Sequence, residues 1–133
     1  PDFERFRLCE LPGLYRESPE GHGLGFNFLK HLVRAKMILL VLDPLSPFVS
    51  GLKEGYDVLL EVLARYDKSF LNIPRVVGVN KMDLPEARRR LEEEKFRPPD
   101  PFFLISVQSG EGIEALMRYL AQQIKGKSES VNG

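Results

Sequence analysis

Four residues, Asn80, Lys81, Met82 and Asp83, directly follow the apolar run RVVGV at residues 75–79. A carboxylate such as Asp83 can accept two charge-assisted hydrogen bonds from paired donors such as the N1–H and 2-amino groups of guanine. Adenine lacks this donor pair, so the same site would reject adenine through unpaired buried groups. Asn80 can donate towards N7 and brace neighbouring loops, and the stem of Lys81 can lie along the base. The alternative is that Asn80 and Asp83 only cap the strand end and the following helix.

A second polar loop, ISVQSGEG, occupies residues 105–112 after another apolar run. Here the backbone N–H of Val107 could contact guanine O6, while Ser106 supports the turn. The alternative is helix capping, in which Ser109 or Gly110 opens the last helix. Alone this loop is weakly informative, but together with NKMD on the neighbouring strand it favours a guanine site.

A third loop, CELPGLYRES, places Glu10 at a strand end and Gly13 three residues later. A carboxylate at this position can hold a magnesium-bound water. The Gly13 amide can approach a γ-phosphate because no Cβ intervenes. An ordinary turn from a strand into a loop explains the same residues equally well.

These loops need a scaffold, and the hydrophobic pattern predicts one in which strands and helices alternate. We expect strands at residues 3–10, 36–43, 74–81 and 102–107, and helices at residues 26–36, 51–66, 85–96 and 110–125. This alternation predicts an α/β fold with a mainly parallel sheet and helices on both faces. The loops ELPG, DPLS, NKMD and SVQSGEG would meet at the carboxyl edge of that sheet, where ligands bind in such folds.

The net charge, the length of the apolar runs and the few cysteine and histidine residues limit the kinds of partner and metal site to expect. Lys plus Arg equal Asp plus Glu at 19 each, so net charge gives no argument for nucleic acid or an anionic membrane. The longest apolar run, MILLVL, is too short to span a bilayer. The single cysteine, Cys9, excludes an internal disulfide and fits a reducing compartment. His22 and His31 lack a matching ligand cluster, and RRRLEEEK at residues 88–95 is interpreted as a solvated helix face with i, i+4 ion pairs.

The stretches LPGLYRESPEGHGLGFNFLKHLVRAKMILLVLD, NKMDLPEA and ISVQSGEG resemble the GTPase domain of the Obg family of P-loop GTPases. The resemblance covers residues 3 to about 125. It implies a three-layer, P-loop-NTPase-like fold that is incomplete at its N-terminus, with GTP or GDP and Mg²⁺ as cofactors of the complete domain. It also implies two groups of site residues: a guanine-binding set of Asn80, Lys81, Asp83, Ser106 and Val107, and a switch II set of Glu10 and Gly13.

The sequence departs from the family pattern in several places. Glu10 stands where the family has Asp, which puts its hold on a magnesium-bound water in question, and Val107 stands where Ala is usual. Leu14 stands where many related GTPases have a water-orienting Gln. No stretch matches the phosphate-binding pattern G-x-x-x-x-G-K-[ST]. We therefore expect residues 1–126 to be a partial GTPase domain whose missing part precedes residue 1, followed by a disordered tail at residues 127–133.

The resemblance implies a GTP-binding and GTP-hydrolysing switch protein linked to ribosome assembly. Its expected partners are a guanine nucleotide and, through the full-length protein, a ribosomal subunit or rRNA, with no membrane or DNA. A cytoplasmic location is expected, with mitochondria or plastids left open. The chain alone would hydrolyse GTP poorly, because this catalysis is chiefly phosphate positioning, and no catalytic residue is assigned. The alternative is a non-catalytic protein-binding remnant without nucleotide affinity. A third alternative is a flavodoxin-like or Rossmann-like enzyme. It would need a Gly-rich loop after an early strand, and the order of the motifs argues against it.

Overall fold

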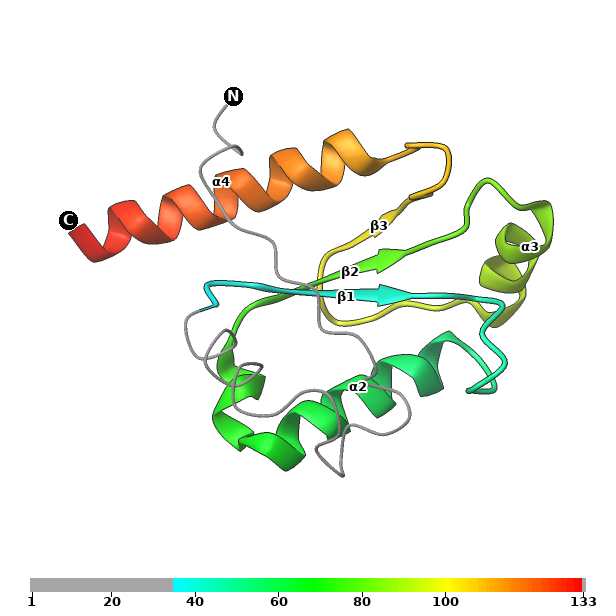
Figure 1. Ribbon diagram of the computed structural model, residues 1–133, viewed down its shortest axis with the longest axis horizontal. Coiled ribbons are helices and arrows are strands. Elements are labelled where there is room, and N and C mark those ends of the chain that lie inside the picture. Colours follow the sequence, from blue (N-terminus) through cyan, green and yellow to red (C-terminus); the bar gives the residue numbers. More distant parts are fainter. Residues whose placement is uncertain (1–34, 133) are drawn as a thin grey trace.

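The computed structural model describes residues 35–132. Within this part the order is strand, helix, short helix, strand, helix, strand and helix (Figure 1). The elements are β1 (Ile38–Leu42), α2 (Leu52–Tyr66), the 3₁₀ helix η3 (Lys68–Asn72), β2 (Arg75–Val79), α3 (Pro85–Glu94), β3 (Phe102–Leu104) and α4 (Ile113–Asn132).

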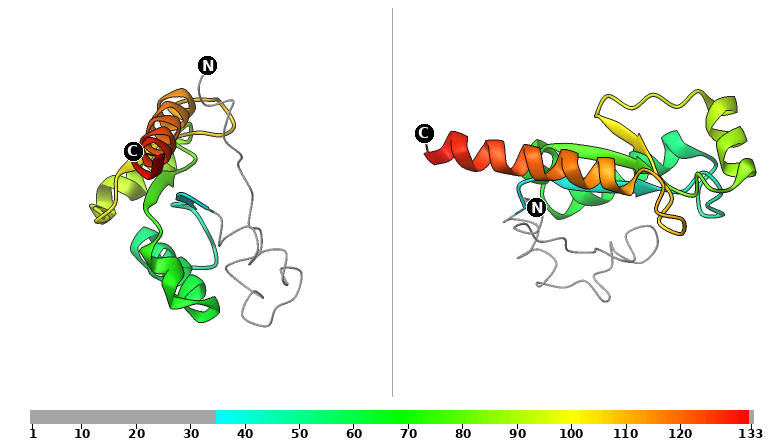
Figure 2. Two further views of the ribbon diagram at one scale, coloured as in Figure 1. Left: turned by 90° about the vertical axis from the view of Figure 1, so that its left-hand side faces the viewer. Right: turned by 90° about the horizontal axis from the view of Figure 1, so that it is seen from above.

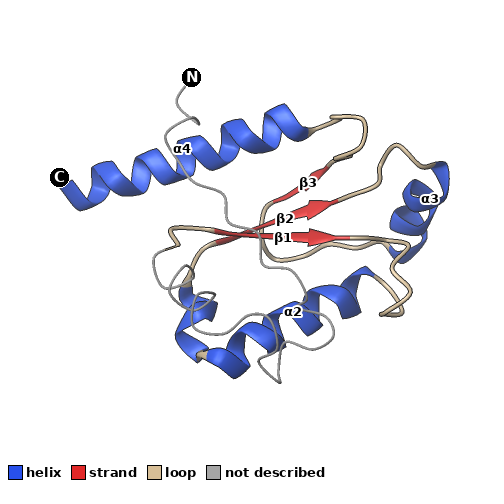
Figure 3. Cartoon of the chain, viewed as in Figure 1, coloured by secondary structure: helices blue, strands red, loops and turns tan. Residues whose placement is uncertain are grey.

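The three strands form one parallel sheet in the order β1-β2-β3 (Figure 3). Leu40 of β1 is in register with Val77 of β2, and Val77 is in register with Phe102 of β3. The middle strand is the most deeply buried, because Val76, Val77 and Val79 are all 0% exposed. A strand whose residues after Arg75 are all apolar or glycine and all buried is typical of the centre of a parallel sheet.

Side chains alternate between the two faces of the sheet, so each face has its own core. On one face, Ile38, Leu40 and Leu42 pack with α2 and α3. On the other face, Val76 and Ile105 pack with Leu116 and Leu120 of α4 and with other side chains of that helix. Figure 2 shows α2 and α4 on opposite sides of the strands. The predicted fold class, α/β with a parallel sheet and helices on both faces, is confirmed.

The helix α2 forms where apolar residues recur every three or four positions. Leu52, Tyr56, Leu59 and Leu63 lie on its buried face, and this spacing produces a continuous apolar stripe. At the other end of the sheet from the polar loops, the Tyr56 hydroxyl donates to Asp100 Oδ2 at 2.6 Å. Burial of the phenol is the main cause that raises the pKa of Tyr56, and the hydrogen bond to Asp100 raises it further.

Most predicted elements are present with modest boundary differences. The predicted strand at 102–107 is shorter, because pairing ends at Leu104 and the chain turns at Ser106. The 3₁₀ helix η3 was not predicted; the Asp67 side chain opens it by accepting from the Ser69 N–H at 2.9 Å. Helix α4 continues to Asn132, past the boundary expected at residue 126.

Two predicted elements fall on residues outside the described part. The strand expected at residues 3–10 lies wholly outside it, and the helix expected at residues 26–36 lies almost wholly outside it. Within the described residues, no helix combines the length and apolar character that crossing a membrane would require.

Candidate functional site

The carboxyl ends of the three strands converge at one edge of the sheet. Asp43 follows β1, Asn80 follows β2 and Ser106 lies two residues after β3. The Asn80 N–H donates to Leu42 O at 2.8 Å, so hydrogen bonding between β1 and β2 continues into the loop. As predicted, the loops DPLS, NKMD and SVQSGEG are neighbours; the fourth loop, ELPG, lies outside the described residues.

The NKMD loop is held in a specific conformation. Lys81 has a left-handed backbone, with φ of 68°, which is uncommon for a residue with a side chain. Met82 is 1% exposed and its N–H donates to Ile105 O at 3.0 Å, which fixes this loop to the end of β3. Lys81 O then accepts from the Leu84 N–H at 2.9 Å and closes a turn into α3. The loop therefore directs Asp83 away from the apolar core, and its side chain is exposed.

The capping explanation for Asp83 does not match this geometry. The residue at the N-cap of α3 is Leu84, and no side chain hydrogen-bonds to this cap. Asp83 Oδ1 instead accepts a hydrogen bond from the Ser106 hydroxyl at 2.8 Å. The second oxygen, Oδ2, has no protein donor among the described residues. It is therefore available to a ligand.

Ser106 is the buried support of the second loop and is 0% exposed. Besides donating to Asp83, its hydroxyl accepts from the Ser109 N–H at 3.0 Å. Its backbone carbonyl accepts from the Gly110 N–H at 2.8 Å, and its N–H donates to Glu111 O at 2.8 Å. The Ser109 side chain does not cap α4, because its Oγ accepts from the Glu111 N–H at 3.3 Å and Glu111 precedes the helix; the Gly110 carbonyl accepts from the Ile113 N–H at 3.2 Å where the helix begins.

Glycine is required at the end of this loop. Gly112 has φ of +74°, and a Cβ there would lie 2.2 Å from the backbone oxygen of Leu104. Gly110 also has a positive φ, +88°, but a Cβ at that position would meet no atom within 4 Å. Only Gly112 is therefore needed both for its conformation and for the close approach of two backbone segments.

A second cross-link joins the two loops. The Val107 N–H donates to Asn80 Oδ1 at 3.0 Å, so Asn80 braces the neighbouring loop as the sequence suggested. This bond leaves the Asn80 Nδ2 group without a protein acceptor among the described residues. It also engages the amide that was expected to contact guanine O6, although the Val107 side chain itself is 65% exposed.

Lys81 forms an ion pair that the sequence analysis did not identify. Its Nζ lies 2.8 Å from Asp43 Oδ2, and Asp43 Oδ1 accepts from the Leu45 N–H at 2.8 Å. The Lys81 stem is thereby drawn across the sheet edge towards the loop after β1. The sequence signal for this pair is the placement of Asp43 directly after a buried parallel strand, in the same position relative to β1 as Asn80 to β2.

The prediction that Arg and Glu side chains of RRRLEEEK, residues 88–95, form i, i+4 ion pairs is wrong. No ion pair joins two residues of α3 in the described structure. Arg88 instead forms an ion pair with Glu111, and its Nε donates to Met82 O at 2.6 Å. Glu94 accepts from backbone N–H groups at the start of α2. Sequence spacing within one helix could not reveal either contact, because both partners lie in other elements.

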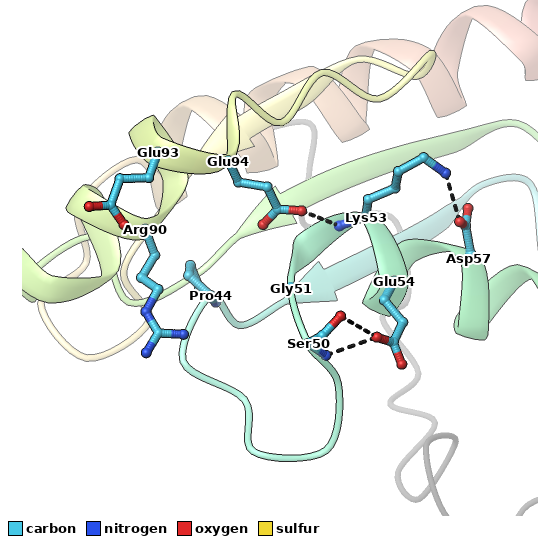
Figure 4. Close-up of a pocket in the computed structure, with 9 residues that line it drawn as sticks. All are labelled: Pro44, Ser50, Gly51, Lys53, Glu54, Asp57, Arg90, Glu93 and Glu94. Atoms are coloured by element: carbon cyan, nitrogen blue, oxygen red, sulfur yellow. Dashed lines mark hydrogen bonds and ion pairs between the residues drawn. The ribbon is translucent and has the colours of Figure 1, made fainter.

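A groove lies between the start of α2 and the end of α3 and is also lined by Pro44 of the DPLS loop (Figure 4). Its charged groups are largely paired: Glu54 accepts from Ser50, and Lys53 forms an ion pair with Asp57 at 2.9 Å. The hydrogen bond from Ser50 lowers the pKa of Glu54. None of the five predicted guanine-binding residues lines this groove, so we do not assign the ligand site to it.

The switch II candidates Glu10 and Gly13 lie outside the described residues, as do Cys9, His22 and His31. The magnesium role expected for Glu10 therefore stays a prediction. Between residues 35 and 132, no group of three or more His, Cys, Asp or Glu side chains is arranged to hold a metal ion.

The chain is similar to curated proteins named GTPase Obg. It is 35% identical over 115 residues to the protein from Caldanaerobacter subterraneus, covering 84% of this chain and 27% of that protein. It is 33% identical over 130 residues to that of Bacillus velezensis, covering 96% and 30%. The Opitutus terrae protein is 36% identical over 121 residues, covering 90% and 35%. The chain thus spans only about a third of the length of these relatives. No protein-family model matches it.

Proposed function

We propose that this chain, which belongs by sequence to the Obg family of GTPases, supplies the guanine-recognition part of a GTP-binding domain. The observation that carries the proposal is the Asp83 carboxylate. One of its oxygens is held by the buried Ser106 hydroxyl at 2.8 Å, and the other has no protein donor among the described residues.

The Ser106 hydroxyl restricts rotation of the Asp83 carboxylate before any ligand arrives. A carboxylate offers about four lone-pair positions, so Oδ1 can accept from Ser106 and from a base donor together. The guanine N1–H and 2-amino groups would then face the two oxygens of Asp83 side by side. Because less orientational freedom is lost on binding, this support favours affinity as well as selectivity for guanine.

The other predicted residues would complete the contact with the base. Asn80 would donate from Nδ2 to N7, since its Oδ1 is already occupied by the Val107 N–H. The Lys81 stem would lie along the base while its Nζ stays with Asp43. Val107 would reach O6 only by sharing its N–H between Asn80 and the base, or by releasing Asn80.

The wider activity is proposed for the full-length protein. By its relationship to Obg GTPases, the complete protein would bind GTP or GDP with Mg²⁺, hydrolyse GTP and act as a switch. A link to ribosome assembly, a ribosomal subunit or rRNA as partner, and a cytoplasmic location are parts of the same proposal. The chain itself lacks a G-x-x-x-x-G-K-[ST] sequence, so we expect it to hydrolyse GTP poorly on its own.

A second candidate is a non-catalytic protein-binding module without nucleotide affinity. One specific observation favours it: the Val107 amide, needed for O6, is engaged by Asn80 at 3.0 Å. The missing phosphate-binding sequence points the same way, because most phosphate contacts would have to come from elsewhere.

The test is to follow backbone amide NMR signals of this chain while GDP is added, with ADP as the ligand control. Guanine recognition predicts shifts at residues 80–83 and 106–107 with GDP and not with ADP.

In Asp83→Asn, which keeps an acceptor for Ser106 but replaces one base-facing oxygen with a donor, GDP affinity should fall about tenfold or more. Asp57→Asn, which removes a carboxylate of α2 paired with Lys53, is the matched control. Equal shifts with ADP would mean binding that does not distinguish the bases and would refute guanine recognition by Asp83, whereas no shifts with millimolar GDP would favour the second candidate.

A further inference from the structure

The geometry points to Arg88 as a positioning residue that ties together the two loops proposed to contact the base. These are the first loop, residues 80–83, and the second loop, residues 106–111. The inference rests on the proposed guanine site, and it adds a residue outside the five that were predicted.

The Arg88 guanidinium bridges the two loops directly. Its Nε donates to the backbone oxygen of Met82, in the first loop, at 2.6 Å. Its terminal nitrogen donates to the carboxylate of Glu111, at the end of the second loop. The backbone oxygen of Glu111 in turn accepts from the Ser106 N–H at 2.8 Å. One rigid, planar group therefore joins the backbone before Asp83 to the residue that holds Ser106.

The contact with Met82 matters because of its place in the chain. The Met82 carbonyl belongs to the peptide group that leads into Asp83, and a peptide group is planar. The Met82 N–H is already fixed by Ile105 O at 3.0 Å. The Met82 N–H lies in the peptide plane before the Met82 Cα and the Met82 carbonyl in the plane after it, so Ile105 anchors the first plane and Arg88 the second. The second plane ends at the Asp83 Cα and therefore constrains the direction of the Asp83 side chain.

Helix stability alone does not explain an arginine at this position. Arg88 lies in the first turn of α3, where its N–H bonds to Leu84 O at 3.2 Å. A cation in the first turn is opposed by the helix dipole. The side chains of the next two arginines, Arg89 and Arg90, form no hydrogen bond or ion pair with any described residue. Of these three arginines, Arg88 is the one that reaches across to another loop.

The test compares two charge-neutralising variants with matched controls in the chain without nucleotide. Arg88→Gln and Glu111→Gln each break the bridge. Arg89→Gln removes an adjacent exposed arginine, and Glu114→Gln removes a carboxylate paired with Arg118 on α4. We expect Glu111→Gln to shift the amide signals of residues 80–83, across the gap between the loops, and to speed exchange of the Met82 N–H. Neither control should do so.

The second readout is GDP affinity. We expect Arg88→Gln and Glu111→Gln each to weaken GDP binding about two- to fivefold, the range for a half-exposed ion pair. The double variant should bind no more weakly than Arg88→Gln alone, because both changes break the same link. Unchanged signals at residues 80–83 in Glu111→Gln would overturn the inference, as would equal losses in the controls. If the wild-type chain does not bind GDP, the proposed function is refuted. The amide signals measured without nucleotide then still decide whether Arg88 couples the two loops.

Discussion

Glu94 caps a helix that begins 42 residues earlier in the chain, and this contact gives a sharp stability prediction. Its Oε1 accepts from the Leu52 N–H and its Oε2 from the Lys53 N–H, both at 2.8 Å. Figure 4 draws the second of these bonds. Gly51, at the N-cap of α2, provides no side chain of its own. A Cβ at Gly51 would lie 2.9 Å from Glu94 Oε1 and 3.1 Å from Glu94 Cδ. Alanine at residue 51 must therefore displace the carboxylate that caps the helix.

The expected magnitudes follow from these contacts. Glu94→Ala removes both cap bonds and a charge favoured by the helix dipole, which should lower the free energy of unfolding by about 1–2 kcal/mol. Gly51 has φ of 179°, an extended conformation that alanine adopts without strain. Gly51→Ala should therefore cost about 1 kcal/mol, through the cap that it disturbs. In the Glu94→Ala background that clash is absent, so Gly51→Ala should be close to neutral.

The assay is urea unfolding followed by circular dichroism for the two single variants and the double variant. Glu93→Ala, which removes a neighbouring exposed carboxylate that accepts no hydrogen bond from any described residue, is the control for losing a charge on α3. The reasoning predicts a coupling of about 1 kcal/mol between positions 51 and 94. An equal cost of Gly51→Ala in both backgrounds would refute it, as would a Glu94→Ala loss no larger than that of Glu93→Ala.

Two further predictions concern other parts of the described chain. Gly112→Ala should cost more than 3 kcal/mol in urea unfolding, since a positive φ and a backbone overlap at 2.2 Å add together. Gly110→Ala, with a positive φ but open space, should cost only about 1 kcal/mol, and equal losses would contradict the overlap. The pKa of Tyr56 is raised in the folded state. The neutral phenol therefore contributes fully to the free energy of unfolding below about pH 10, and this contribution is lost as pH rises through the folded-state pKa. Unfolding midpoints measured from pH 8 to 11 should therefore fall less steeply in Tyr56→Phe, and an unchanged slope would count against this origin.

The sequence was sufficient to predict the scaffold because each strand carries its own signal. Val76, Val77 and Val79 place apolar side chains on both faces of their strand, a pattern typical of a central parallel strand. Helix α2 could be predicted equally well from the helical spacing of Leu52, Leu59 and other apolar residues. The meeting of the DPLS, NKMD and SVQSGEG loops then followed from topology, since parallel strands end at the same edge. No side-chain contact had to be known for that step.

The polar contacts at this edge could not be predicted in the same way. Arg88, Arg89 and Arg90 are chemically identical, and only the rotation of α3 relative to the sheet makes Arg88 reach Met82 and Glu111. The Asp83–Ser106 hydrogen bond joins residues 23 positions apart. Such partners depend on how two elements pack, to within the length of one hydrogen bond. Local patterns in a sequence do not define packing to that accuracy.

Three hydrogen bonds join the first base-contacting loop to the segment that follows β3. The Met82 N–H is held by Ile105, Asp83 by Ser106 and Asn80 by Val107. Each of these bonds is made within residues 80–107. The loops therefore carry their own support. We expect base selectivity to survive in this chain at low affinity, because a base pocket adds orientation and selectivity while phosphate contacts add most of the charge-assisted bonds.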